Sequence, residues 1–368
     1  MPNRASAMES LSPAFARTKQ LLFRPFRFGL WARLAVVALV TGEAGGVGGG
    51  SSIPNLNNNR GGEDQLAGAA RFFGLPGWEQ MQPYAGLIAV GLAVGLAVLL
   101  LWVYSDCVYR FILLDAVVSG RCQLREGWRR WREAGRRYFV WVMAFGIGSF
   151  AVVGVVAGIP AWLAYRAGWF DKPQQNLGVL IGGGILLGLL VIAIVAILAI
   201  IDMLGRDFLV PVMAFEDVGV IDGWERLLAM MGAEKSAYAV YVLMKIVLAI
   251  GSGIIFAVIN LIVILILLIP LGLLGLAGYF IGSGLGITWD LSTELLLGAV
   301  GLLAIAGILY VVGFVYAPGL VFFQSYTVEF FAPRYGPLGS KIFPPSPATP
   351  ISPLLPSTPL VPGDAFPA

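Results

Sequence analysis

Histidine is absent from the 368-residue sequence, and only two cysteines, Cys107 and Cys122, are present. The lack of histidine excludes Ser-His-Asp and Cys-His nucleophile pairs, imidazole metal ligands and bis-histidine haem. Two thiols without a CxxC motif cannot close a zinc or iron–sulfur site on their own. We therefore expect two unpaired thiols near the cytoplasmic face, no catalytic, cofactor-binding or metal-binding residues, and no enzymatic activity.

Charge is scarce as well, because Asp, Glu, Lys and Arg make up 12% of the chain, against about 25% in an average soluble protein. Apolar residues make up 58% and occur in several long runs. Runs of about 20 apolar residues are long enough to cross a bilayer as helices. These features exclude a disordered chain, a coiled coil and an ordinary soluble enzyme. They predict an all-α integral membrane protein.

About six transmembrane helices are expected within a polytopic domain over residues 30–331. The first is marginal because it contains Arg33 and Glu43 and ends in a glycine run, so a re-entrant segment is the alternative. The expected spans are 30–47, 84–104, 139–165, 177–201, 239–269 and 295–323.

The fifth span allows two interpretations, because residues 238–287 are apolar almost throughout and contain Pro270. One is a long helix followed by a broken or re-entrant piece over 270–286, and the other is two full helices. The first gives six spans in total and the second gives seven. We favour six, because seven would place the C-terminus, with its basic residues, outside the cell.

Basic residues set the expected orientation. Segment 105–138 contains eight arginines, the arm over residues 1–29 is also basic, and segment 286–294 contains neither Lys nor Arg. Because Lys and Arg accumulate in cytoplasmic loops, both termini are expected in the cytoplasm. The expected location is the inner (plasma) membrane, and the family resemblance described below implies that the cell is bacterial.

A Pro-rich tail, expected to be disordered, covers residues 332–368. Every third residue from Pro344 to Pro362 is proline, which matches the three-residue turn of polyproline II. Such a segment is either a disordered extension or a ligand for a groove that binds prolines. The tail therefore offers a possible handle for a protein partner, and no nucleic-acid partner is expected.

An internal repeat links two polar segments of the chain. The run Phe111–Val117 precedes Gly127-Trp128, and the run Phe208–Ala214 precedes Gly223-Trp224 at nearly the same distance. A shorter echo occurs at Ala317–Phe322. Each Gly-Trp pair opens a stretch with one apolar helical face, so we expect two interfacial amphipathic helices.

The first of these helices places tryptophans on one face and arginines on the neighbouring stripe. That pattern is typical of a helix in the headgroup plane, in contact with anionic lipid headgroups. Simple topological anchoring is the alternative, and the second copy carries acids in place of the arginines. The candidate interfacial lipid contacts are Arg125, Trp128, Arg129, Trp131, Arg132 and Arg136.

Strong polar groups within the spans are few. Asn260 is the clearest mid-span hydrogen-bonding residue, and Pro211 and Pro318 are candidate helix breaks of the kind that build transporter sites; the alternative is that they only turn the chain at the interface. Interfacial carboxylates could in principle hold a divalent cation, although ordinary surface positions explain them more simply. These carboxylates are Asp115, Asp202, Asp207, Glu216 and Asp217.

Several short motifs resemble an uncharacterised family of bacterial multi-pass membrane proteins, over roughly residues 15–338. They are Leu22-Phe-x-Pro25-Phe26, Trp31-x-Arg33, Arg110-Phe-Ile-Leu-Leu-Asp115 with Trp128-Arg129, and Asp207-Phe-Leu-Val-Pro-Val-Met213 with Trp224.

The Pro-turn-then-helix unit is more distantly similar to the membrane domain of some glycerophosphoryl diester phosphodiesterases. The chain departs from these relatives by lacking a catalytic phosphodiesterase domain. It also has Glu225 where the family often has arginine. The resemblance implies a helical membrane domain with no assigned activity, and it supplies no catalytic residues.

Two functions are therefore considered. The first is a non-enzymatic scaffold or partner subunit of the membrane, with the Pro-rich tail as its handle. The alternative is a transporter or a membrane protein that handles lipids or small molecules. Retention of the same partners by a tail-less chain would count against the handle.

Overall fold

The computed structural model describes residues 6–24, 26–41, 85–169, 174, 176–284 and 291–343, and its elements are helices apart from one isolated β-bridge. The predicted all-α class is confirmed. The helices are α1 (Leu11–Phe23), α2 (Phe28–Val40), α5 (Ala85–Ser119), α6 (Leu124–Arg166), α7 (Leu177–Leu204), the π-helical η3 (Gly205–Leu209), α8 (Val210–Glu216), α9 (Val220–Ala233), α10 (Lys235–Gly284), α11 (Leu291–Phe331) and α12 (Gly336–Ile342).

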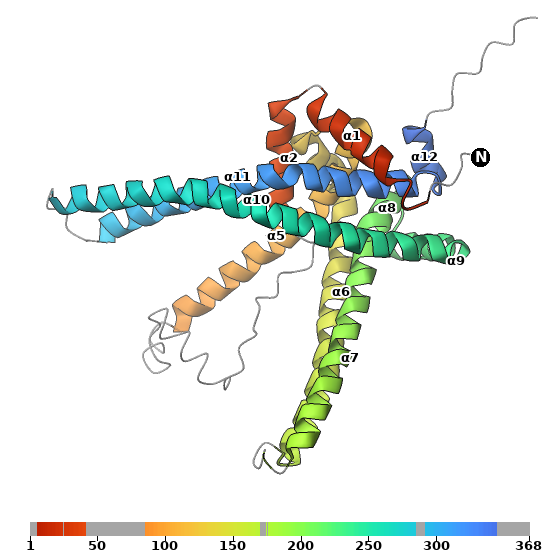
Figure 1. Ribbon diagram of the computed structural model, residues 1–368, viewed down its shortest axis with the longest axis horizontal. Coiled ribbons are helices and arrows are strands. Elements are labelled where there is room, and N and C mark those ends of the chain that lie inside the picture. Colours follow the sequence, from red (N-terminus) through yellow and green to blue (C-terminus); the bar gives the residue numbers. More distant parts are fainter. Residues whose placement is uncertain are drawn as a thin grey trace, which may run out of the picture.

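Five helical runs in the described residues are long and apolar enough to cross a membrane. Figure 1 shows that α6 and α7 form one hairpin, that α10 and α11 form another, and that α5 leaves in a third direction. The long apolar parts of these five helical runs are called the legs here, and most of their large apolar side chains are exposed. Apolar helices without a protein partner are stable in lipid but not in water, so the chain has the character of a membrane-embedded protein.

The first of the six expected spans is shorter than predicted. Helix α2 covers Phe28–Val40, which is 13 residues, whereas a spanning helix needs about 20. The remainder of the expected span, including Glu43, lies outside the described residues. Among the described residues, the structure therefore has five helices long and apolar enough to span a membrane and one shorter apolar helix.

The predicted break after residue 269 is wrong for the part that the structure describes. Helix α10 runs without interruption for 50 residues, with Pro270 inside it. A proline removes one backbone donor and bends a helix, but apolar helices tolerate this in a membrane environment. Residues 270–284 therefore continue the leg and are not a re-entrant piece.

Only one of the two expected interfacial helices is separate. Helix α9 is an independent element, whereas residues 124–137 form the first turns of α6 and continue into its apolar leg. No proline interrupts the sequence between Leu124 and Phe139, so nothing ends the helix where the apolar leg begins.

The C-terminal part of the chain folds further than expected. Helix α12 lies within residues 332–343, where the sequence predicted a disordered tail, and its Leu338 is fully buried. The proline repeat from Pro344 onward lies outside the described residues.

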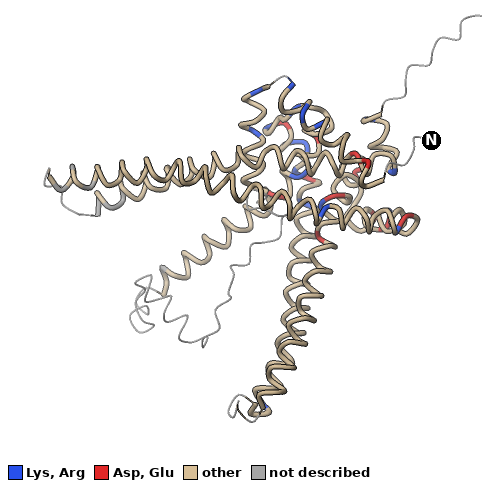
Figure 2. The backbone as a smooth tube through the Cα atoms, in the orientation of Figure 1, with Lys and Arg blue, Asp and Glu red and all other residues tan. Residues whose placement is uncertain are grey.

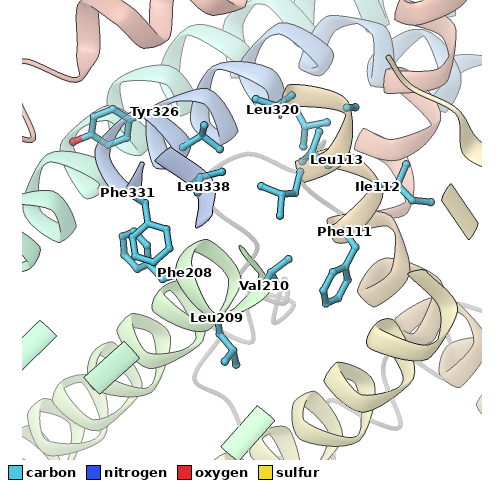
Figure 3. Packing of buried hydrophobic residues seen from close by; sticks show 14 of the residues in the cluster. Phe111, Ile112, Leu113, Phe208, Leu209, Val210, Leu320, Tyr326, Phe331 and Leu338 are labelled. Carbon is cyan, nitrogen blue, oxygen red and sulfur yellow. The ribbon is translucent and has the colours of Figure 1, made fainter. Parts of the chain in front are cut away.

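The legs meet in a packed centre, called the hub here, whose largest buried side chains include Phe111, Phe208 and Phe331. The ring of Phe208 lies 4.9 Å from that of Tyr241 and 5.0 Å from that of Phe331, measured between centroids. Figure 3 shows side chains from α5, η3, α8, α11 and α12 gathered there. Figure 2 shows that charged residues also collect around the hub and are nearly absent from the legs.

Both copies of the internal repeat pack in the same way. A Cβ atom added to Gly127 would lie 2.9 Å from the side chain of Ile112, the residue after Phe111. A Cβ atom added to Gly223 would lie 2.6 Å from Leu209, the residue after Phe208. In each copy, glycine lets the second helix approach the first closely, which is the physical reason for its place in the repeat.

The turn between α5 and α6 holds a buried thiol. Cys122 is 3% exposed, and its carbonyl oxygen accepts a hydrogen bond of 2.7 Å from Arg33 on α2. Burial raises the pKa of the Cys122 thiol to about 11, and the Arg33 charge opposes this only in part. The thiol is therefore protonated at neutral pH, and thiols react with maleimides as thiolates.

We expect maleimide to label Cys122 slowly in a Cys107→Ala background. The labelling rate should rise about tenfold per pH unit up to pH 10, because the thiolate fraction grows until pH reaches the pKa. The same chain unfolded in detergent should label at least tenfold faster at pH 7 and reach its plateau near pH 9. Equal rates for folded and unfolded chains would contradict the buried turn.

Candidate functional site

Two ion pairs, each between an aspartate and the arginine four residues later, lie next to one cavity near the hub. On α5, the Arg110 guanidinium binds the Asp106 carboxylate one turn earlier, at 3.0 Å and 3.2 Å. Where α7 passes into η3, Arg206 of η3 binds Asp202 of α7, also one turn earlier. Each pair follows the spacing Asp-x-x-x-Arg and lies just before the phenylalanine that opens its copy of the repeat.

Between the arginine and the phenylalanine, the second copy contains one residue more than the first, and between the phenylalanine and the tryptophan it contains one residue fewer. Arg110 directly precedes Phe111, whereas Asp207 stands between Arg206 and Phe208. The extra residue coincides with the π-helical turn η3, where the Val210 N–H donates to the Gly205 carbonyl oxygen. Such single-turn π-bulges accommodate an extra residue within a helix and occur frequently at functional sites.

The extra residue Asp207 is the centre of a buried polar network. Its carboxylate lies 2.5 Å from the Lys245 ammonium on α10 and accepts a hydrogen bond of 2.9 Å from the Tyr241 hydroxyl. Tyr241 in turn lies 2.8 Å from the Thr327 hydroxyl on α11. The network therefore joins η3 to both helices of the second hairpin.

A cavity of about 430 Å³, called the junction pocket here, opens beside these charged groups. Its walls come from α5, α7, η3, α8, α10 and α11, so every spanning helix except α6 contributes. The charged lining residues lie at its hub end: Arg110, Asp202, Arg206, Asp207 and Lys245. Most of the remaining lining is apolar and includes Leu113, Ala196, Ala199, Ile200, Ile246 and Ala249.

The electrostatic environment of the pocket is balanced. Three cations and two carboxylates line it, and Asp106, which pairs with Arg110 but does not line the pocket, brings the formal charge of the three ion pairs to zero. Charges that leave water for an apolar environment are tolerated when they are paired and hydrogen-bonded. A ligand that is also neutral overall but dipolar would keep this balance.

The residues predicted to contact lipid headgroups divide into two sets. Trp128 and Trp131 pack toward α5, with ring centroids 5.8 Å from Tyr104 and 5.7 Å from Phe111 respectively. They therefore contribute to packing at the hub. The arginines of the neighbouring stripe, by contrast, are all exposed: Arg125, Arg129, Arg132 and Arg136.

The predicted helix breaks are not breaks. Pro318 lies inside the continuous α11, and Pro211 follows η3 within one helical run. Pro211 has no backbone N–H to donate to a carbonyl one turn earlier. The helix nevertheless continues through this position, with the π-helical turn η3 just before it. Asn260 is buried and donates to the Phe256 carbonyl oxygen on its own helix. None of the three lines the junction pocket.

The carboxylates considered as cation ligands do not converge. In the part of the chain that the structure describes, no group of three or more Cys, Asp or Glu residues is placed to hold a metal ion. Asp202 and Asp207 each bind a basic side chain instead. Glu216 binds Arg226, and Asp217 binds Arg137 at 3.1 Å.

Sequence reasoning named Asp202 and Asp207 but did not connect either of them with Lys245. Their contacts join segments about 40 residues apart in the chain, between residues 207 and 245, which helical periodicity cannot reveal. One available signal was missed, because the shared Asp-x-x-x-Arg spacing and the extra residue in the second copy are both visible in the sequence.

Comparison with known proteins adds one finding. Residues 5–339 match DUF7544, which is described as a family of unknown function. No curated protein and no solved structure matches the chain. The comparisons give no link to the membrane domain of glycerophosphoryl diester phosphodiesterases.

Proposed function

We propose that this chain, which belongs to the DUF7544 family of unknown function, binds an amphiphilic lipid or small molecule in the junction pocket as a multi-pass membrane protein. The observation that carries the proposal is the division of the pocket into a charged hub end and an apolar wall. Ligand pockets combine mostly apolar walls with a few placed polar groups. An amphiphile has the same division, with a polar head and an apolar body.

The position of the pocket also favours a ligand from the membrane. Its apolar wall is formed by α7 and α10, which belong to different hairpins and diverge from the hub (Figure 1). Ala196 and Ala199 on α7 are exposed on this wall. An acyl chain or other apolar body could therefore lie along the legs while its head reaches the ion pairs.

The role is proposed to be non-enzymatic handling of the ligand, with both termini in the cytoplasm of a bacterial cell. The scaffold or partner-subunit role favoured by the sequence stays a prediction, and most of the Pro-rich tail expected to bind the partner lies outside the described residues. Pull-down with and without residues 344–368 tests the role of the tail independently of the pocket.

The variant Ala199→Trp tests the proposed function. Ala199 is an exposed wall residue of the pocket, so an indole there fills space without entering the packed hub. We expect native mass spectrometry to show at least a fivefold loss of retained lipid or metabolite adducts.

Ala193→Trp is the matched control, because Ala193 is equally exposed on α7 but does not line the pocket. It lies about 9 Å further along the helix axis, at 1.5 Å per residue. Equal retention by the two variants would exclude the junction pocket as the binding site.

A further inference from the structure

We infer that the ligand of the junction pocket is a zwitterionic phospholipid, whose headgroup carries a phosphate and an ammonium group. This inference rests on the proposed function and adds the chemical class of the ligand. It follows from the charge balance, from the accessibility of the individual charged groups and from the shape of the apolar wall.

The charge balance selects a headgroup without net charge. The cations Arg110, Arg206 and Lys245 are equal in number to the carboxylates that pair with them, which are Asp106, Asp202 and Asp207. An anionic headgroup would therefore add an uncompensated charge to a partly dehydrated site, which is costly at low dielectric. A headgroup with one positive and one negative group leaves the sum at zero.

Accessibility selects the pair that meets the ligand. The side chains of Arg206 and Asp202 are 21% and 23% exposed, whereas those of Lys245 and Asp207 are 13% and 8% exposed. The more open pair therefore presents one positive and one negative group to the cavity. A guanidinium has five N–H donors, and a carboxylate has about four acceptor positions. Each can hold its partner and a ligand group together.

The chemistry of this pair matches a phosphate–ammonium headgroup. Guanidinium groups bind phosphate oxygens through charged, often bidentate, hydrogen bonds. A carboxylate is a strong acceptor for the N–H groups of a primary ammonium. Arg206 would therefore bind the phosphate and Asp202 the ammonium, with the i,i+4 spacing of the two residues setting the distance between the sites.

The apolar wall accounts for the rest of the lipid. Ala199, Ile246 and Ala249 line the cavity next to the charged groups. The large apolar residues further along α7 and α10 are mostly exposed. Acyl chains that leave the cavity between α7 and α10 would pack against these apolar side chains, which no described part of the protein covers.

The test is competition between two lipids that differ in headgroup charge. The purified full-length protein in detergent is mixed with equal amounts of palmitoyl-oleoyl phosphatidylethanolamine and phosphatidylglycerol, and bound adducts are counted by native mass spectrometry. We expect about a tenfold preference for the ethanolamine lipid, the size of one charged hydrogen-bonded contact.

Charge variants make the test specific. Asp202→Asn leaves the site with one excess positive charge, so it should shift the preference toward phosphatidylglycerol by about tenfold or more. Asp222→Asn on α9 is the matched control. Asp222 is exposed and does not line the pocket, so this substitution removes the same charge at a site away from the ligand. It should leave the lipid preference unchanged. Arg206→Gln is a second variant and should reduce binding of both lipids by about tenfold.

The outcomes separate the two proposals. Equal binding of both lipids to the wild-type protein, abolished by Ala199→Trp, would overturn the zwitterion assignment and leave the binding pocket in place. Adducts that persist in Ala199→Trp would overturn the pocket itself. If Asp202→Asn fails to fold, as judged by gel filtration, undiminished binding of both lipids by a folded Arg206→Gln protein would overturn the assignment.

Discussion

Replacing Lys245 by methionine is expected to lower the free energy of unfolding by about 3–5 kcal/mol, the cost of leaving a buried charge without its partner. Lys245 lies 2.5 Å from both carboxylate oxygens of Asp207, and the Asp207 side chain is only 8% exposed. Without the ammonium group, the buried carboxylate keeps hydrogen bonds such as that from Tyr241 but loses its counter-charge. Unfolding by sodium dodecyl sulfate in mixed micelles measures the loss.

A double variant separates this cause from a loss of packing. Asp207→Asn combined with Lys245→Met removes both charges, so it should recover more than half of the lost stability. Lys235→Met is the control for removal of an ammonium group, because Lys235 is exposed at the start of α10. A Lys245→Met protein as stable as the Lys235→Met protein would show that the buried pair does not hold the helices together.

Replacing Phe208 by alanine should cost a similar amount, about 3–5 kcal/mol, because it opens a cavity in the hub. Phe208 is fully buried between η3, α10 and α11, where its ring contacts those of Tyr238, Tyr241, Phe330 and Phe331. These rings come from two separate helices, α10 and α11, so the surrounding side chains cannot easily collapse into the space. The thermal midpoint followed by intrinsic fluorescence should fall accordingly.

Phe150→Ala provides the comparison on a leg. Phe150 is 83% exposed on α6, so its removal exposes no cavity and should change stability by less than about 0.5 kcal/mol. Similar losses for the two variants would mean that the hub does not carry the tertiary stability of the protein.

The helical legs and the repeat follow from the sequence because they depend on local patterns. Long runs such as 177–201 contain no charge, which permits little other than a spanning helix. The glycines at positions 127 and 223 and the tryptophans that follow them mark the repeat without any knowledge of the fold. The large excess of apolar residues fixes the class before any single position is considered.

The errors arose where a residue's usual local effect did not decide the structure. Pro270 and Pro318 are read as breaks in a sequence, yet each lies within a continuous helix. Trp128 and Trp131 resemble interfacial anchors, and the structure shows in addition that their rings pack against Tyr104 and Phe111 of α5. Whether a proline ends a helix, and what a tryptophan packs against, depends on tertiary neighbours. Composition and periodicity carry no information about those neighbours.

The candidate site was missed for the same reason. Asp207 and Lys245 are ordinary interfacial residues when considered one at a time, and only the meeting of η3 with α10 makes them a buried pair. The sequence does contain a trace of this arrangement, since Asp207 is the one residue that the first copy of the repeat lacks at that place. An extra residue at one place in a repeated helix therefore marks a local change of helix geometry, here the π-helical turn η3.

The most direct measurement is photo-crosslinking of the protein in lipid nanodiscs that contain a phosphatidylethanolamine with a diazirine next to its glycerol. Adducts are mapped to peptides by mass spectrometry. They are expected to concentrate on the pocket wall, at Ala196, Ala199 and Ala249, and to disappear from it in the Ala199→Trp protein. Adducts spread evenly along the exposed faces of α6, α7, α10 and α11, with none enriched at the pocket, would contradict a lipid site at the junction of the helices.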